Sequence, residues 1–366
     1  MSTLLLGPGP SNAPDAVLDA LHEPLIGHLD PRFLKTLDDT KRKLRQVMLT
    51  ENEVTFPVSG TGSAGTEATM ANVLEEGDTV VVGVNGVFGG RAANLAERYG
   101  VKAVRVEAPW GEAVKLDDLA AAAREHKPAI IAVISGETST GVYQPMDGLG
   151  ELARETGSLL LADCVTSLAG MPVRMDEWGV DLIYSGTQKC LNCPPGLAPV
   201  SFSERAVERF EGRTTPVPSF YLDLGEILKY VRSGDGKRAY HHTAPVSMVA
   251  ALDKALDVIL DEGLEARWDR HADAADYLIG KLEPLGIEPL VKPEHRLHPL
   301  TTVTIPDTVE DEAAVRSRLL ERHDIELGAG LGPLAGKVWR IGLMGVNARR
   351  EVVDRFIDAL TDCMKN

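Results

Sequence analysis

Short apolar runs alternate with helix-like stretches between residues 80 and 184, and this alternation limits the possible folds of the chain. The strand-like runs are Val80–Val84, Val104–Val106, Ile130–Ile134, Leu159–Ala162 and Leu182–Tyr184. Between them lie segments with helical spacing, such as Leu116–Arg124. Strands that alternate with helices are typical of a mostly parallel sheet covered by helices on both faces. The sequence therefore predicts an α/β fold.

The length of the chain indicates more than one domain. Its 366 residues, 44% of them hydrophobic, exceed what one compact domain usually needs. We expect a large domain over residues 1–262 and a smaller α+β domain over residues 263–366, with a helical run at Val246–Leu260 leading to the boundary. The elements expected in the second domain are strands at Thr301–Ile305 and Val338–Ile341 and helices at Glu312–Arg322 and Arg349–Met364.

One lysine and one aspartate follow neighbouring predicted strands. Lys189 comes shortly after the run Asp181–Tyr184 and before a Pro-Pro-Gly turn, which restricts the backbone around it. Asp163 follows the apolar run Leu159–Ala162, so both side chains are expected at the crevice where open α/β sheets bind ligands. Pyridoxal 5'-phosphate needs such a pair, a lysine for the Schiff base and a carboxylate beside the pyridinium nitrogen. The two residues together predict this cofactor.

A turn rich in small residues predicts a phosphate site. The strand-like run Glu53–Val58 leads into SGTGSAGTEA, and a helix follows. Backbone N–H groups at such a helix start suit a phosphate dianion, with Thr61, Gly62 and Ser63 as contacts. The same glycines also fit G-x-G-x-x-G, the pattern of a dinucleotide-binding dehydrogenase. That alternative lacks the acidic residue expected after the second strand, because Thr79–Val84 runs into Asn and Gly.

Several further motifs are spread along nearly the whole chain. They are LLLGPGPSN (Leu4–Asn12), NGVFGGRA (Asn85–Ala92), GETSTGV (Gly136–Val142), LADCVTSLAG, SGTQKCLNCPPG (Ser185–Gly196), YHHTAPV (Tyr240–Val246) and GLGPLAGKVWRIGLMG (Gly330–Gly345). In this order they resemble the class V, fold type I, pyridoxal phosphate aminotransferases, and specifically the alanine–glyoxylate and serine–glyoxylate (serine–pyruvate) group. The resemblance implies a large domain built on a seven-stranded type of sheet, with the N-terminal residues 1–15 near the active site.

The resemblance also implies roles for individual residues. Lys189 would form the Schiff base and transfer the substrate proton, with Asp163 beside the pyridine nitrogen. The remaining cofactor-binding residues would be Thr61, Gly62, Ser63 and Gln188 at the phosphate, Phe88 and Thr138 beside the ring, and Tyr240 and Thr243 from the neighbouring subunit of a homodimer. The substrate-binding residues would be Arg340, whose guanidinium suits a carboxylate, and Gly9.

Two positions depart from the family pattern. Phe88 stands where the family often has a tryptophan stacked on the pyridine ring, so we expect less of the cofactor to be covered. Ser63 replaces a histidine of the mammalian phosphate site and supplies one hydrogen bond but no imidazole. The substrate preference need not transfer across these changes.

The charge and the ends of the chain exclude other classes. A net charge of −16 argues against nucleic-acid binding, which needs clustered lysine and arginine. No apolar run reaches membrane-spanning length, and the N-terminus does not resemble a signal peptide, so we expect a cytoplasmic protein without membrane contact. The C-terminal Cys-Met-Lys-Asn lacks a Ser-Lys-Leu type of peroxisomal address.

No metal site is expected. The four cysteines lack zinc spacing, and we expect all of them to be free thiols. His241 and His242 are adjacent, and on a strand they would face opposite ways, so they would not hold one metal ion together.

These features favour a ping-pong transamination from a small amino acid, alanine or serine, to glyoxylate or pyruvate. A cysteine desulfurase or another lyase of the same fold is an alternative, but desulfurases typically have a histidine before the lysine and a reactive cysteine on a later loop. Here Gln188 precedes Lys189, and no cysteine lies between Cys193 and Cys363. A non-enzymatic binding protein that kept the fold is the alternative from another class.

Overall fold

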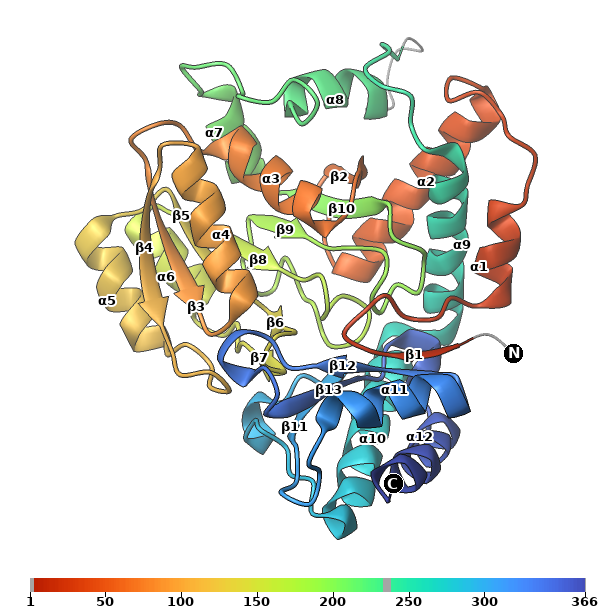
Figure 1. Ribbon diagram of the computed structural model, residues 1–366. Coiled ribbons are helices and arrows are strands. Elements are labelled where there is room, and N and C mark those ends of the chain that lie inside the picture. Colours follow the sequence, from red (N-terminus) through yellow and green to blue (C-terminus); the bar gives the residue numbers. More distant parts are fainter. Residues whose placement is uncertain (1–2, 233–237, 366) are drawn as a thin grey trace.

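A seven-stranded sheet forms the centre of the larger part of the molecule (Figure 1). The computed structural model describes residues 3–232 and 238–365. In order across the sheet the strands are β2 (Val54–Ser59), β10 (Leu197–Phe202), β9 (Leu182–Tyr184), β8 (Leu159–Asp163), β5 (Ile130–Ile134), β3 (Thr79–Val84) and β4 (Lys102–Glu107). Only β10 runs antiparallel to its neighbours among these strands. The expected mostly parallel α/β sheet is therefore confirmed.

Helices pack on this sheet because the chain returns across it between parallel strands. The helices that follow the strands of the sheet are α3 (Gly62–Val73), α4 (Val87–Arg98), α5 (Leu116–His126), α6 (Leu149–Thr156), α7 (Glu204–Glu211) and α8 (Leu224–Val231). Near the β2 edge lie α1 (Asp15–Leu21), α2 (Pro31–Met48) and α9 (Val246–Glu262). A short hairpin, β6 (Gly136–Glu137) with β7 (Val142–Tyr143), follows β5.

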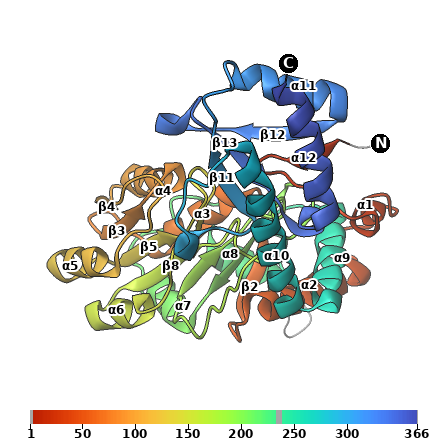
Figure 2. The ribbon, with the colours of Figure 1, turned by 90° about the horizontal axis from the view of Figure 1, so that it is seen from below.

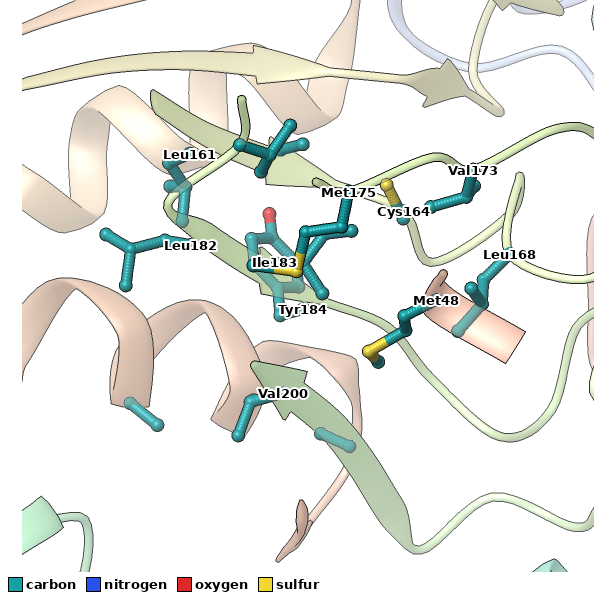
Figure 3. Packing of buried hydrophobic residues seen from close by; sticks show 14 of the residues in the cluster. Met48, Leu161, Cys164, Leu168, Val173, Met175, Leu182, Ile183, Tyr184 and Val200 are labelled. Carbon is teal, nitrogen blue, oxygen red and sulfur yellow. The ribbon is translucent and has the colours of Figure 1, made fainter. Parts of the chain in front are cut away.

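The core under the sheet consists of aliphatic side chains from neighbouring strands. Figure 3 shows Leu161 of β8, Ile183 of β9 and Val200 of β10 with Met48 of α2 and Met175, all buried. Because successive strand residues point to opposite faces, strands buried on both sides become continuous apolar runs. This is why the sequence predicts β5 and β8 so closely.

A second, four-stranded sheet packs with helices of the C-terminal part of the chain (Figure 2). It has its own hydrophobic core, in which Trp339 and Phe356 are fully buried. Its strand order is β1 (Leu4–Leu6), β12 (Ile325–Ala329), β13 (Val338–Gly342) and β11 (Leu300–Thr304). It packs with α10 (Leu264–Leu282), α11 (Glu312–His323) and α12 (Arg350–Met364). The first strand of the chain thus pairs with strands near its C-terminal end.

None of the described helices is both long and apolar enough to span a bilayer.

Candidate active site

A cavity of about 440 Å³ opens at the carboxyl ends of β8 and β9. It brings together most of the residues predicted to bind the cofactor, namely Thr61, Gly62, Ser63, Phe88, Thr138, Asp163, Gln188 and Lys189. These residues come from distant parts of the sequence, but parallel strands end on the same edge of a sheet and so place the loops that follow them side by side.

Lys189 lies in the loop after β9 and contacts the N-terminal segment of the chain at Pro8 and Gly9. Its Nζ donates a hydrogen bond to the carbonyl of Pro8. Gly9 has a φ of +110°, and a Cβ atom there would lie 2.4 Å from Nζ, so only glycine permits this close approach. Burial lowers the pKa of Lys189 to about 8; Cys190 and Asp163 oppose this shift, and nearby Arg340 contributes to it. A substantial fraction of the amine is therefore neutral near pH 8.

Asp163 is the buried carboxylate of the cavity. Its Oδ1 accepts the N–H of Val165 at 2.9 Å, and its Oδ2 accepts the hydroxyl of Tyr184 at 2.6 Å. Burial raises its pKa to about 6, while the bond from Tyr184 opposes that shift. The group is thus ionised at neutral pH and carries a negative charge at the floor of the cavity.

Tyr184 was not among the predicted site residues. The register of β8 and β9 pairs it directly with Asp163. Tyr184 ends a short apolar run, and its only distinguishing sequence feature is a polar hydroxyl at the carboxyl end of a buried strand.

The start of α3 presents polar groups that the chain itself does not use. The N–H groups of Gly62 and Ser63 have no acceptor among the described residues, and the side chain of Thr61 makes no capping bond. The buried Oε1 of Gln188 also has no partner among them. The two free N–H groups lie at the positive end of a helix and can donate to a phosphate, so this site fits the cofactor predicted from the sequence.

Phe88 lies in the first turn of α4 and forms part of the cavity wall. The guanidinium of Arg91 stands 5.1 Å from the centre of its ring. One face of the ring is thus covered by a cation, which is a favourable arrangement for an aromatic ring.

Arg340 and Gly9, the two predicted substrate residues, do not line this cavity themselves. Arg340 on β13 is buried and donates from Nη1 to the carbonyl of Thr138 at 3.0 Å and from Nε to the carbonyl of Ala329 at 2.6 Å. Its Nη2 meets no acceptor in the described part of the chain. Burial lowers the pKa of Arg340 from its ordinary value. Arg340 therefore reaches the site beside Thr138, a cavity residue.

Tyr240 and Thr243 lie outside the cavity of their own chain. Tyr240 is 63% exposed, and its hydroxyl stands 3.4 Å from that of Thr243. Their neighbours His241 and His242 correct one expectation, because they lie in a loop rather than on a strand, and their Nδ1 atoms are 2.8 Å apart. The premise that these two rings must face opposite ways was wrong, since it rested on strand geometry.

All four cysteines are buried free thiols, as expected. Cys190 follows Lys189 directly, yet its Sγ donates to the carbonyl of Thr166 and burial raises its pKa to about 12. A thiol in that state is a poor nucleophile, because thiolate is the reactive form.

Comparison with known proteins agrees with this geometry. The family described as "Aminotransferase class-V" matches residues 3–356. The chain belongs to the class-V aminotransferases. The family uses pyridoxal phosphate, so this class-V aminotransferase is a pyridoxal phosphate enzyme, and the dehydrogenase interpretation of the glycine turn is not favoured. A desulfurase or a non-enzymatic binding protein is not favoured.

Three relatives show how closely this class-V aminotransferase matches known members. An alanine–glyoxylate aminotransferase of Felis catus is 43% identical over 99% of this chain and 87% of its own length. The crystal structure of an alanine–glyoxylate aminotransferase from Nostoc sp. has a TM-score of 0.96 and 50% identity, covering 100% of this chain and 96% of the other. A (S)-ureidoglycine–glyoxylate transaminase of Bacillus subtilis is 34% identical, with 95% and 87% covered.

Proposed function

We propose that the enzyme transfers the amino group of a small L-amino acid, alanine or serine, to glyoxylate or pyruvate. The observation that carries this proposal is the placement of Lys189 and Asp163 in one cavity with unpaired phosphate-type donors. The names of the relatives support glyoxylate as acceptor. Two of them are alanine–glyoxylate aminotransferases, and the third is a (S)-ureidoglycine–glyoxylate transaminase.

The cofactor, when bound, supplies an electron sink that carries the amino group between the two substrates. Lys189 moves the substrate proton at its Nζ, and a pKa of about 8 suits an amine that must both accept and return a proton near neutral pH. Asp163, ionised and fixed by Tyr184 and Val165, holds a negative charge at the end of β8. These two side chains are the catalytic pair of the proposal.

The substrate carboxylate is assigned to Arg340. Its Nη2 is the group left free after Nη1 and Nε bind backbone carbonyls, and the two bonds fix the plane of the guanidinium. A preorganised donor loses less entropy when it binds an anion than a mobile one does. This accounts for recognition of an amino acid and a 2-oxo acid by the same site.

The segment Pro8–Gly9 supports a small substrate. It contacts Lys189 on one side, and Pro8 also lies against Gly328, where an added Cβ would stand 2.6 Å from its ring. We propose that this backbone, packed against the lysine, restricts the substrate side chain to a small group, as in alanine, serine and glyoxylate.

A homodimer with shared sites is part of the proposal. Tyr240 and Thr243 are exposed and stand outside their own cavity, so they are free to reach the phosphate of a neighbouring subunit. Sedimentation of the holoenzyme, compared with a Tyr240→Phe, Thr243→Ala double variant, tests this assignment. Weaker cofactor retention by a variant that remains dimeric supports it, whereas a wild-type monomer with full activity contradicts it. The cytoplasmic location stays a proposal, which fractionation of producing cells would test.

The first experiment follows the half-reaction without an acceptor. L-alanine, L-serine and L-aspartate are added in turn to the holoenzyme, and the visible band of the bound cofactor is recorded together with pyruvate or hydroxypyruvate released. Loss of the band with alanine or serine, but not in Lys189→Ala, supports the proposal. Turnover of aspartate alone would contradict the proposed donors, and no response to any donor would contradict transamination of these substrates.

A further inference from the structure

Glu137 is a buried carboxyl group beside the active site that has no part in the proposed chemistry. It belongs to β6 and is fully buried. It forms no ion pair with any described lysine or arginine, and all of its partners are N–H and hydroxyl donors. Burying a carboxylate costs free energy unless several hydrogen bonds compensate, so these donors are needed to keep Glu137 in its buried position.

Two of those donors are backbone N–H groups in the first turn of α4. Oε2 of Glu137 accepts the N–H of Phe88 at 2.9 Å and the N–H of Gly89 at 3.3 Å. The hydroxyl of Ser139 accepts the N–H of Val87 at 2.9 Å and donates to Oε1 of Glu137 at 2.6 Å. The start of the helix is therefore capped by a loop about fifty positions further along the chain.

Gly86 makes this distant cap possible. As the N-cap residue it has no side chain to bind the first turn itself. A Cβ at this position would lie 2.4 Å from Oγ of Ser139 and 2.5 Å from Cδ of Glu137. The carboxyl group thus fits directly against the helix start, where the dipole favours a negative charge.

Thr138, which lies between Glu137 and Ser139 in the chain, contacts the proposed substrate-binding residue Arg340. The backbone carbonyl of Thr138 accepts Nη1 of Arg340 at 3.0 Å. The short segment 137–139 consequently holds Phe88 through one set of bonds and Arg340 through another. A displacement of this segment would move both the ring wall and the guanidinium.

We propose that Glu137 is a positioning residue that fixes Phe88 against the cofactor ring and, through the backbone of Thr138, fixes Arg340 toward the substrate carboxylate. This inference rests on the proposed roles of Phe88 and Arg340. Glu137 itself does not line the cavity, and its contribution is the geometry of the two groups that bind the cofactor and the substrate.

The test compares Glu137→Gln with the wild-type holoenzyme. The amide keeps the size of the side chain, but its NH₂ end cannot accept an N–H, so at least one donor of α4 or Ser139 loses its acceptor. We expect the dissociation constant of pyridoxal phosphate and the KM for glyoxylate each to rise about tenfold, because a hydrogen bond to a charged group is lost. The visible circular dichroism of the bound cofactor should also change, since it reports the orientation of the ring.

Glu107→Gln is the matched control, because it removes one negative charge from the exposed end of β4. It should keep wild-type values of all three quantities. Ser139→Ala is a second test variant, which removes one donor to Glu137 and the acceptor of Val87, and it should shift the same quantities by a smaller factor. It keeps the inference testable if Glu137→Gln does not fold.

A Glu137→Gln enzyme with wild-type circular dichroism, cofactor affinity and KM would overturn the inference. A fall in melting temperature without change in those three quantities would also overturn it, since it would show a structural role only. If the wild-type enzyme does not use glyoxylate, the proposed acceptor fails, but cofactor affinity and circular dichroism still decide the role of Glu137.

Discussion

The two sides of the Lys189 loop differ in how their polar groups are used. On the cavity side, the N–H groups of Gly62 and Ser63 and the Oε1 of Gln188 have no partners within the described chain. On the opposite side, Asn192 donates to Ser11, Asn12 and Met344 and accepts from Arg267 and Val346. Arg267 also binds the carbonyl of Cys190 at 2.8 Å and the carboxylate of Glu262 at 2.6 Å.

This contrast shows how a loop can present unpaired groups without collapsing. The side behind the lysine is saturated with hydrogen bonds that join the N-terminal segment, α10 and the loop after β13. Groups fixed in this way do not need to reorganise when a ligand arrives, and preorganisation is a large part of binding and catalysis. The two sides should therefore respond differently to mutation, the cavity side in function and the opposite side in stability.

Replacement of the lysine itself should have the largest effect. We expect Lys189→Ala to lower kcat by at least about a hundredfold, because the proton-transfer group is lost, and to leave the free energy of unfolding of the cofactor-free protein little changed. Steady-state kinetics and urea unfolding measure the two quantities. Lys292→Ala, at an exposed site, is the control. Retention of more than a tenth of wild-type kcat would refute the catalytic role.

Arg267→Met should destabilise the side of the Lys189 loop that faces away from the cavity. Arg267 is 1% exposed, and its replacement removes the donor to the carbonyls of Ala169 and Cys190 and one of the two arginines that pair with Glu262. We expect a loss of about 3–5 kcal/mol of stability. Arg124→Met removes an exposed pair with Glu155 and should leave the free energy of unfolding almost unchanged. Equal losses in the two variants, measured by urea unfolding, would remove the distinction between the two sides.

Arg340→Lys keeps the positive charge and removes the planar fork. We expect the KM for glyoxylate to rise about tenfold, since a lysine cannot keep both backbone bonds and also present the fixed Nη2 donor, while the dissociation constant of the cofactor stays the same. Kinetics and a cofactor titration separate these outcomes. A parallel rise in both constants would place Arg340 at the cofactor rather than at the substrate.

The pH dependence of cofactor uptake should follow Lys189. Below its pKa of about 8 the amine is protonated and cannot attack an aldehyde, so the uptake rate should rise with pH and level off above about 8. We expect roughly a tenfold gain per pH unit well below that value. Stopped-flow absorbance of the cofactor-free protein measures this rate. A plateau that begins only near the ordinary lysine pKa would show that burial does not shift this group.

Ser63→Ala should have the smallest effect. It removes a single hydroxyl from the phosphate side, so we expect the dissociation constant of the cofactor to rise about fivefold, near 1 kcal/mol. Unfolding of the cofactor-free protein should not change. A loss of stability without cofactor would show that the hydroxyl serves the fold rather than the ligand.

The sequence predicts this site well where parallel strands determine it. Lys189 and Asp163 follow adjacent strands, and that topology alone places them together. The contact of Tyr184 with Asp163 depends on strand register, which an apolar run does not reveal. The reversed strand β10 was not anticipated, because Pro199 within it argues against a central strand.

The remaining contacts join residues far apart in the chain. Glu137 meets α4 across 48 to 49 positions, and Asn192 meets Met344 and Val346 across 152 and 154 positions. Such pairs follow from tertiary packing, and no local spacing encodes them. For the same reason the arrangement of His241 and His242 could not be read from their adjacency once they proved to lie in a loop.

The pairing of β1 with β12 has a consequence for synthesis on the ribosome. Leu4 pairs with Ile325, and Pro8 and Gly9 follow directly to touch Lys189. The segment with Leu4 must therefore wait for a strand that is synthesised much later than the segment itself. The active-site lysine acquires its backbone neighbour in the final position only after β12 has left the ribosome, so a nascent chain that lacks β12 has no finished active site.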